Sequence, residues 1–457
     1  MSADRIVVIG AGPTGLGAGY RLNELKHPDW VVLEANNYVG GLATSFTDEA
    51  GFTYDIGGHV MFSHYPYYDK IVERIMGDQY SELIREAWVW MEGRFIPYPF
   101  QNNIKDLEKE TVLECLMGLI ETQKTEHHPE NFREWIDAVF GPGIAKHFMI
   151  PYNFKVWSTP AELMNYVWIG ERVAVTDLKK VLRNVIYDRP DVSWGPNNTF
   201  KYPLKGTGAL WDGMAEFIKP NLRLRSRVTG VDARARLVRT ADGRVHAYDA
   251  LLSTMPLNRL IEMMPEAPES VRAAAGQLEW NSSHIVGVAV DRPANTSRNW
   301  IYFPEPEVPF YRVTYLSNYS PHITPKPDQT LFLTETTSSK YKPEDSRTIV
   351  QRVIDGLVKV GLMEEADRGR IVTTWLCSPE MEYPIPTLAR DQALGTIQPW
   401  LREQNIWSRG RFGAWLYEIG NMDHSAMQGV EFVNNALHGE EETVWIARGE
   451  TAAQAAA

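Results

Sequence analysis

The chain has 457 residues, and its 44% hydrophobic and 23% charged residues are typical of a globular protein and not of a disordered one. A formal net charge of −12 excludes a general affinity for nucleic acid or for an anionic membrane, so a phosphate site would need a basic pocket of its own. Two cysteines, apolar runs well short of ~20 residues and a start without a signal-peptide core predict a cytoplasmic protein without a disulfide framework or a membrane span.

The N-terminal segment has the order of a βαβ unit that binds a dinucleotide. Residues 5–9 form a β-branched run that predicts a strand, and residues 10–15, Gly-Ala-Gly-Pro-Thr-Gly, fit the pattern GxGxxG. A helical pattern continues to Leu25, and a second apolar run over residues 30–33 ends at Glu34. The glycine pattern therefore stands in the strand–helix–strand context that a nucleotide site needs.

Each part of this pattern has a predicted role. Gly10 allows a tight turn, Gly12 lets the backbone approach a pyrophosphate, and Gly15 lets the helix pack closely on the strand. Glu34 is placed to accept hydrogen bonds from ribose hydroxyls and disfavours a 2′-phosphate, so FAD or NAD is expected here and not NADP. The alternative is a glycine-rich turn that binds nothing.

Two further glycine pairs favour FAD over NAD. One pair lies in residues 40–42 and the other in residues 57–59, and paired glycines let a backbone lie against a flat ring or a pyrophosphate. Each pair alone is also compatible with an ordinary turn, but a simple NAD-binding domain does not need a second set. Cofactor contacts are expected from Gly41, Leu42, Gly57, Gly58 and His59.

The remaining chain alternates between helical and strand-like patterns. Two segments rich in aromatic and amide side chains, residues 98–103 and 151–157, suit either a nucleobase and sugar site or the packing of a core. The predicted elements are helices over about 105–190, short strands over 223–255, an antiparallel sheet over 284–336, a helix over 345–361, and a strand, glycine turn and helix over 411–438.

Two arginines stand in apolar surroundings, Arg172 within residues 168–173 and Arg312 within residues 310–313. A desolvated guanidinium needs a fixed anion, and two of them can hold a diphosphate through paired hydrogen bonds. An internal salt bridge, for example from Arg172 to Glu171, satisfies the same requirement, and the sequence leaves both interpretations open. No metal site is expected, because His59 and His64 have no acidic or cysteine partner at ligand spacing.

The two ends of the chain predict one nucleotide-binding domain that insertions interrupt. The expected fold class is α/β: a discontinuous Rossmann-like FAD-binding domain with an inserted helical domain and an inserted antiparallel β-sheet domain. The predicted bounds are 1–85, 198–275 and 390–450 for the FAD-binding domain, 103–197 for the helical insertion, 86–102 and 276–389 for the sheet domain, and 451–457 for a tail.

Several long and unusual segments resemble one family over nearly the whole chain. They include GAGPTGLGA (10–18), YDIGGHVMFSH (54–64), PYPFQNNI (97–104), PYNFKVW (151–157) and WSRGRFGAWLYEIGN (407–421). On these motifs the sequence resembles the UDP-galactopyranose mutases, in particular their eukaryotic branch of fungal and protozoan enzymes.

The resemblance implies an isomerase that interconverts UDP-galactopyranose and UDP-galactofuranose without net redox change. In that family the FAD must be reduced, its N5 attacks the anomeric carbon and expels UDP, and the covalent adduct opens and recloses through another hydroxyl. This is covalent catalysis with a leaving group whose charge must be stabilised. NADPH is the implied reductant, with Arg85 as a candidate contact to its 2′-phosphate.

The resemblance also implies roles for individual residues. Arg172 and Arg312 correspond to the diphosphate clamp, and both are expected to be catalytic together with His59 and Arg411. The implied substrate contacts are Tyr302, Tyr383 and Tyr417 to phosphate, Tyr98, Gln101 and Asn153 to uridine, and Trp157 and Asn197 on the sugar side. The implied flavin contacts near the C-terminus are Arg411, Gly420, Asn421 and Ser425.

Three alternatives stay open on the sequence. The first is the same chemistry on another nucleotide hexose, since the motifs fix the uridine diphosphate better than the sugar. The second is a flavin oxidoreductase of the amine oxidase type, which shares the FAD pattern but needs no paired arginines. The third is a nucleotide-sugar binder without catalysis. The oligomeric state is left open.

Overall fold

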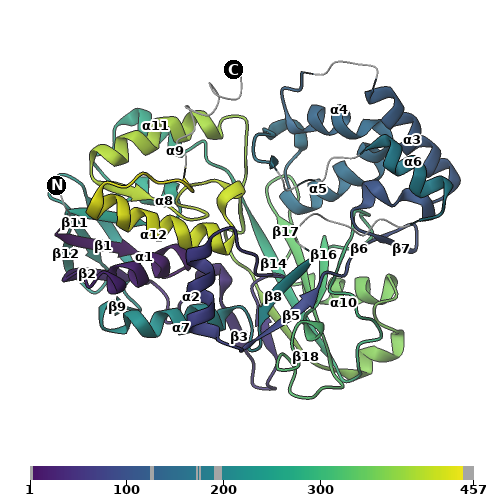
Figure 1. The fold of residues 1–457 in the computed structure, drawn as a ribbon, viewed down its shortest axis with the longest axis horizontal. Helices are drawn as coiled ribbons and strands as arrows, with labels where there is room; N and C mark the ends of the chain where they lie inside the picture. The colour runs from purple at the N-terminus through teal and green to yellow at the C-terminus, as the bar shows by residue number, and fades with distance from the viewer. Residues whose placement is uncertain (1–3, 124–127, 171–172, 174–176, 190–197, 446–457) are drawn as a thin grey trace.

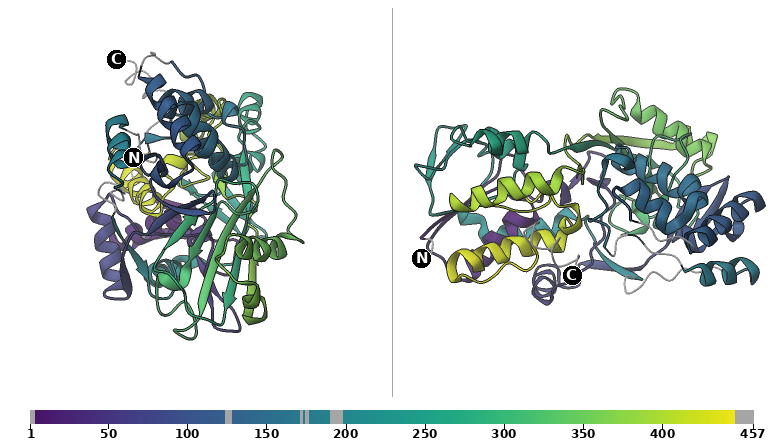
Figure 2. Two further views of the ribbon diagram at one scale, coloured as in Figure 1. Left: turned by 90° about the vertical axis from the view of Figure 1, so that its right-hand side faces the viewer. Right: turned by 90° about the horizontal axis from the view of Figure 1, so that it is seen from above.

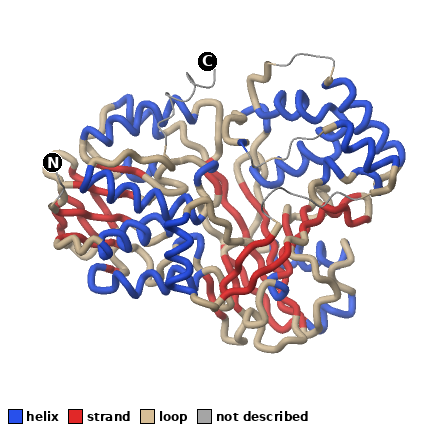
Figure 3. Tube along the Cα trace, viewed as in Figure 1, coloured by secondary structure: helices blue, strands red, loops and turns tan. Residues whose placement is uncertain are grey.

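The computed structural model describes residues 4–123, 128–170, 173, 177–189 and 198–445. Figure 1 shows three groups of elements: a layered α/β group that holds the first and the last described residues, a group of helices, and a large sheet. In Figure 3 the group of helices is almost wholly blue, whereas red strands dominate the large sheet.

A five-stranded parallel sheet forms the centre of the α/β group. Its strand order is β20-β13-β1-β2-β9, so segments from the start, middle and end of the chain pair side by side. The strands are β1 (Arg5–Ile9), β2 (Asp29–Leu33), β9 (Leu222–Arg223), β13 (Ala250–Ser253) and β20 (Ile406–Ser408).

Both faces of this sheet are covered, because alternate side chains of each strand point to opposite faces. Val8 of β1 packs into a core with α1 (Pro13–Glu24), α2 (Pro66–Met76), α7 (Gly208–Ile218) and α12 (Met422–His438). Val7 packs on the other face, with α8 (Leu257–Glu262), α9 (Glu269–Ala275) and α11 (Arg390–Glu403). A small antiparallel sheet of β10 (Val228–Asp232), β11 (Leu237–Thr240) and β12 (Val245–Ala247) packs on that face through side chains of β10 and β11.

Glycine allows α1 and α12 to touch backbone to backbone. A Cβ at Gly429 of α12 would lie 1.9 Å from the carbonyl oxygen of Thr14, and one at Gly17 of α1 would lie 2.3 Å from that of Ala426. Neither helix could therefore approach the other with a larger side chain at these positions. In the view from above in Figure 2, α12 is drawn in yellow, and α11, which packs on the opposite face of the sheet, in yellow-green.

The large sheet is antiparallel at every pairing except β15 with β6. Its main order is β18-β14-β17-β16-β15-β6-β7, and β19 pairs with one end of β14. The strands are β6 (Ala87–Met91), β7 (Arg94–Pro97), β14 (Trp280–Val290), β15 (Trp300–Tyr302), β16 (Arg312–Tyr315), β17 (Thr330–Ser338), β18 (Ile371–Cys377) and β19 (Tyr383–Pro384). Helix α10 (Ile349–Lys359) packs on one face of this sheet.

The helical group has its own apolar core of buried side chains. It contains α3 (Lys109–Thr122), α4 (Phe132–Ile144), α5 (Ile150–Trp157) and α6 (Leu178–Ile186). Two short antiparallel pairs complete the described part, β3 (Ser45–Thr47) with β4 (Thr53–Asp55), and β5 (Tyr80–Ile84) with β8 (Thr199–Pro203).

The predicted α/β class with extra helices and an antiparallel sheet is confirmed. The predicted strand at the start of residues 411–438 is wrong, because the strand lies earlier, at β20, and α12 follows only after turns. Gly410 and Trp415 have φ values of +85° and +56°, which an extended strand cannot contain. Within the described ranges, no helix is both long and apolar enough to cross a membrane.

Candidate active site

The glycine-rich loop follows β1 and leads into α1, as the sequence predicts. Gly10 has φ of +96°, and a Cβ there would lie 2.1 Å from the Oγ1 of Thr254. A Cβ at Gly15 would lie 1.8 Å from the carbonyl oxygen of Gly10, so the third glycine lets the helix pack against the loop. Gly12 is the N-cap of α1, in an extended conformation without a capping side chain. The first turn of α1 therefore offers N–H groups and a positive dipole end to an anion.

Glu34, directly after β2, holds this loop in place. Its Oε2 accepts a hydrogen bond of 2.8 Å from the backbone N–H of Ala11, and its Oε1 accepts one of 2.8 Å from that of Asn36. The residue is only 7% exposed. Each carboxylate oxygen has a second lone pair, so Glu34 can hold the loop and still accept from a hydroxyl.

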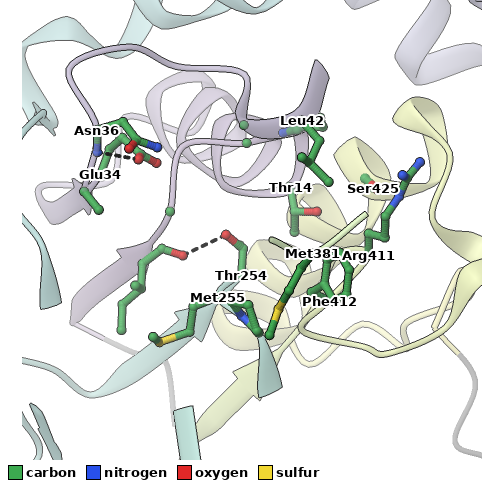
Figure 4. Close-up of a pocket in the computed structure, with 18 of the residues that line it drawn as sticks. Thr14, Glu34, Asn36, Leu42, Thr254, Met255, Met381, Arg411, Phe412 and Ser425 are labelled. Atoms are coloured by element: carbon green, nitrogen blue, oxygen red, sulfur yellow. Dashed lines mark hydrogen bonds between the residues drawn. The ribbon is translucent and has the colours of Figure 1, made fainter. Parts of the chain in front are cut away.

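A cavity of about 540 Å³ opens at this loop. Figure 4 shows Glu34 and Asn36 on one side of it, Arg411 and Ser425 on the opposite side, and Thr14 and Leu42 in the region between. The predicted cofactor residues that line it are Gly10, Gly12, Glu34, Gly41, Leu42, His59, Arg411, Gly420 and Ser425.

The residues of this cavity fit a flavin dinucleotide. A helix N-terminus suits a pyrophosphate, and the carboxylate of Glu34 suits the hydroxyls of a ribose. Gly12 and Gly41 face each other closely, since a Cβ at Gly41 would lie 3.4 Å from the Cα of Gly12. At the far side, the buried Nδ1 of His59 has no hydrogen-bond partner within the described residues, so it is a polar atom that a ligand could satisfy.

A smaller cavity of about 160 Å³ adjoins the first, because His59, Arg411 and Met422 line both. The predicted residues in its wall are Gly57, Gly58, His59, Arg312, Tyr383, Arg411, Tyr417 and Asn421. A ligand group bound in the larger cavity next to these shared residues would therefore face a second ligand bound in the smaller cavity.

Arg312 is a half-buried cation in the wall of the smaller cavity. It lies on β16, opposite Glu335 of β17, and its Nη2 donates a hydrogen bond of 2.7 Å to Oε1 of Glu335, while its Nε donates to Oε2. Gly58 donates a backbone hydrogen bond of 2.6 Å to the same Oε1. Burial alone would lower the pKa of Arg312, but the charge of Glu335 holds that pKa well above its usual value. The arginine is therefore charged and fixed in place, with an internal ion pair.

The residues also match known proteins. The pattern of the flavin containing amine oxidoreductases fits residues 13–409. A crystal structure of reduced UDP-galactopyranose mutase is 40% identical to the chain, covers 98% of this chain and 97% of its own, and superposes with a TM-score of 0.94. The chain belongs to the UDP-galactopyranose mutase family.

More distant structures share the fold of this family but not its sequence. A provisionally named protoporphyrinogen oxidase from Exiguobacterium sp. 255-15 is 18% identical, covers 96% of this chain and 100% of its own, and has a TM-score of 0.73. A fatty acid isomerase from P. acnes is 16% identical, covers 94% of this chain and 98% of its own, and has a TM-score of 0.63. At such identities the likeness shows the fold alone, so the amine oxidase alternative has only family-level support.

The tyrosines expected at substrate lie in two neighbouring aromatic groups. Tyr383 and Tyr417, with ring centroids 5.6 Å apart, line the smaller cavity. Tyr98 and Tyr302, 5.1 Å apart, pack together outside it, and Tyr302 also packs against Tyr152.

Other predicted substrate residues line neither cavity. Trp157 is 2% exposed and packs in the core of the helical group, with its ring centroid 4.7 Å from that of Tyr417 in the cavity wall. The amide of Asn153 donates a hydrogen bond of 2.7 Å to the carbonyl oxygen of Met149 in its own helical segment. Gln101 is buried near the start of that group. Arg172 and Asn197 lie outside the described residues, as does Glu171, the suggested partner of Arg172.

Sequence reasoning missed three acidic residues of the smaller cavity, Glu335, Glu382 and Asp423. The position of Glu335 could have been predicted if the pairing of the two strands had been known, because this pairing places it opposite Arg312. No sequence signal marks Glu382 beyond its place next to Tyr383. The carboxyl groups of Glu335 and Glu382 lie together, since a Cβ at Gly57 would be 2.6 Å from Oε1 of Glu335 and 3.9 Å from Oε1 of Glu382.

His64 has an acidic partner, Asp423, that lies far from it in the sequence. Its Nδ1 lies 2.7 Å from Oδ2 of Asp423, and His424 bonds the other oxygen at 3.0 Å. Burial would raise the pKa of Asp423, but the interactions with His424 and the hydrogen bond from His64 lower it to about 2. The carboxylate is therefore ionised and shared between two segments of the chain.

Proposed function

We propose that this chain interconverts UDP-galactopyranose and UDP-galactofuranose. The observation that carries the proposal is the 40% identity to reduced UDP-galactopyranose mutase across 98% of the chain. The two adjoining cavities support it, because one fits a flavin dinucleotide and the other contains a fixed arginine. When bound, the reduced flavin supplies an electron-rich ring nitrogen that can attack a sugar carbon.

The residues of the chain then bind and orient the nucleotide sugar. Arg312 stabilises the diphosphate, both bound and leaving, because a guanidinium already fixed by Glu335 needs no reorganisation when negative charge develops. Arg172 is its proposed partner. The hydroxyls of Tyr302, Tyr383 and Tyr417 are the further proposed phosphate donors, Tyr98, Gln101 and Asn153 the uridine contacts, and Trp157 and Asn197 the sugar-side contacts.

His59 is neutral at the boundary of the two cavities. Burial, the largest influence, and the charge of Arg411 together lower the pKa of His59 to about 4. A neutral imidazole in that place does not repel the positive charge that develops on a sugar when its leaving group departs. We also assign NADPH as the reductant, with Arg85 near its phosphate, a cytoplasmic location, and the domain bounds predicted from the sequence.

The test is anaerobic turnover. Flavin-loaded protein, reduced with dithionite, is incubated with UDP-galactofuranose, and the pyranose is separated by chromatography. The expected result is conversion with reduced flavin and none with oxidised flavin. Oxidation of the sugar with release of peroxide would support an amine-oxidase-type reaction instead, and failure of the reduced protein to convert the sugar would contradict the proposal.

The substrate arginine is tested in the same assay. Substitution of Arg312 by Lys keeps the charge but removes the paired hydrogen bonds, and we expect a marked loss of kcat/KM for the UDP-sugar. Unchanged kinetics would show that Arg312 does not hold the diphosphate.

A further inference from the structure

Glu382 is a buried acid in the wall of the smaller cavity that the family resemblance did not point to. It is 4% exposed and directly precedes β19. Its backbone is fixed on both sides: its N–H donates a hydrogen bond of 2.8 Å to the carbonyl oxygen of Asn281, and its own carbonyl oxygen accepts one of 3.4 Å from Arg411. The side chain is therefore held at the cavity by a rigid backbone.

The carboxyl group itself is incompletely satisfied. Its Oε2 is buried and has no hydrogen-bond partner within the described parts of the chain. Buried polar atoms of this kind are rare in folded proteins and call for a ligand or a function. Since the residue lines the smaller cavity, a molecule bound there is the available partner.

The surroundings raise the pKa of Glu382 into the neutral range. Burial is the largest influence and raises its pKa, the negative charge of Glu335 raises it further, and Arg411 and Arg312 oppose both, with a net pKa of about 7. The other titratable neighbours that feel its charge are Tyr311, Cys377 and Tyr383, whose pKa values are all raised.

The neighbouring carboxyl group is in the opposite state. Hydrogen bonds from Arg312 and from the N–H of Gly58, together with the charge of Arg312, outweigh burial and lower the pKa of Glu335. One cavity thus contains a carboxylate that is ionised at neutral pH and a carboxyl group that is protonated below about pH 7. Environments that separate two acids in this way are a mark of acid–base catalysis.

The proposed reaction requires a group that exchanges protons. In galactopyranose O5 is bonded to the anomeric carbon and O4 carries a proton, whereas in galactofuranose O4 is bonded and O5 carries the proton. Isomerisation therefore moves one proton from O4 to O5. The other titratable groups with shifted pKa values in the smaller cavity are poorly matched to this exchange: the pKa values of His59, Glu335 and Asp423 are lowered and that of Tyr383 is raised well above its usual value.

We propose that Glu382 is the proton carrier of the isomerisation. Its carboxylic acid gives a proton to O5 as the bond from the anomeric carbon to O5 breaks. The resulting carboxylate takes the proton of the O4 hydroxyl as the bond from the anomeric carbon to O4 forms, which restores the acid with no net transfer of electrons. This inference rests on the proposed function, because it assumes a galactose ring in the smaller cavity.

The first test does not depend on turnover. Infrared difference spectra of flavin-loaded wild type and Glu382→Gln are recorded as the pH is raised from 5 to 9. We expect a carbonyl band of a protonated carboxylic acid that shifts in deuterium oxide, disappears near pH 7 and is missing from the variant. The difference removes the contribution of other buried acids such as Asp55. Absence of the band at pH 5 would overturn the inference.

The second test is kinetic. The amide of Glu382→Gln resembles the neutral acid in shape and polarity but carries no exchangeable acid, so we expect kcat to fall by about 10²- to 10³-fold with little change in KM. In the wild type, activity should decline as the pH rises above about 7, because the acid is lost, and this decline should be absent in the variant. Glu382→Asp, which keeps an acid, should retain more activity than the amide.

Glu279→Gln is the matched control, since Glu279 forms a salt bridge with Lys340 outside both cavities. Flavin absorbance and the unfolding temperature report whether each variant is folded. A Glu382→Gln enzyme with the kcat and pH profile of the wild type would overturn the inference while leaving the proposed function intact. An inactive wild type would overturn both, although the infrared band would still report the protonation state of Glu382.

Discussion

Arg312 and Glu335 show why a functional charge in a protein interior needs a partner. The pair lies across two neighbouring strands, and the carboxylate also accepts from the backbone of Gly58. Removing one member of a buried pair leaves an uncompensated charge, which costs about 3–5 kcal/mol. The ion pair is therefore a structural requirement as well as part of the candidate site.

A pair of variants separates these two roles. We expect Arg312→Met to lower the free energy of unfolding by about 3–5 kcal/mol, because Glu335 is left charged and buried. The double variant Arg312→Met, Glu335→Gln should recover much of that loss, since the amide is neutral and its oxygen can still accept from Gly58. Urea denaturation measures both. Neither variant should turn over UDP-sugar, and activity in the double variant would show that the charge is not needed for catalysis.

Glu34 also has two roles, because it holds the glycine-rich loop in place and lines the cavity that fits the flavin dinucleotide. Glutamine at this position would place an NH₂ group toward the N–H of either Ala11 or Asn36, so one of the two loop hydrogen bonds is lost. At about 1.5–3 kcal/mol for a bond to a charged group, we expect Glu34→Gln to weaken FAD binding roughly 10- to 100-fold. Quenching of flavin fluorescence in a titration of apoprotein measures the Kd. An unchanged Kd would separate the loop from the nucleotide site.

The sequence predicts the conformation of residues that belong to a short motif, but not the properties of residues that depend on contacts with distant segments of the chain. Gly10 and Gly15 do what the GxGxxG pattern predicts, because the turn and the close packing involve neighbours in sequence. The raised pKa of Glu382 comes first from its burial, and its charged neighbours Arg411 and Glu335 belong to other segments of the chain. No spacing rule could bring these three residues together before the fold was known.

At the scale of elements, the C-terminal segment gives the sharpest difference between pattern and structure. The aromatic run around Trp415 looks like a strand, but Gly410 and Trp415 adopt positive φ values, and the segment turns to line both cavities. Its Phe412 and Trp415 are buried for packing and not for sheet formation. The apolar pattern of this segment correctly predicts buried side chains but wrongly predicts a strand, because a strand and a packed turn can both bury aromatic side chains.

The start of α12 is held to residues 57–64 through Asp423. The N–H of His64 and its ring both bond Oδ2 of Asp423, so the carboxylate links the first residues of the helix to a segment that lines the smaller cavity. An acid in the first turn of a helix also interacts favourably with the helix dipole.

This link predicts a pH dependence. The pKa of Asp423 is about 2 in the folded state and about 3.9 in an unfolded chain, so the stabilisation is complete above pH 4 and is lost as the pH falls toward 2. We expect Asp423→Asn to be about 2 kcal/mol less stable at pH 6, with the difference from the wild type narrowing as the pH falls below 4. Urea denaturation at pH 6, 4 and 3 measures it, and a difference that does not depend on pH would assign the loss to packing.

At the scale of the whole molecule, the larger cavity is built from widely separated segments. Gly12 and Glu34 come from the N-terminal part, Thr254 from the middle, and Gly410 and Ser425 from the C-terminal part. The sequence indicated this discontinuous arrangement only because nucleotide-binding patterns stand near both ends. The predicted bounds placed residues 86–102 and 276–389 in one sheet domain, but neither segment indicated that β6 would pair with β15 through residues 87–89 and 300–302.

Because one cavity unites these segments, its ligand should stabilise the whole fold and not a single part. A ligand that binds only the folded state raises the free energy of unfolding by about 2.7 kcal/mol at a free concentration 100 times its Kd. We therefore expect removal of the flavin to lower the unfolding temperature, and FAD added to the apoprotein to restore it in a concentration-dependent way. FMN, which lacks the adenosine that Glu34 and the α1 N-terminus are placed to hold, should restore much less at the same concentration. Equal stabilisation by FMN and FAD in calorimetry would mean that the protein binds only the isoalloxazine part of the cofactor. It would contradict the assignment of the glycine-rich loop as the pyrophosphate site.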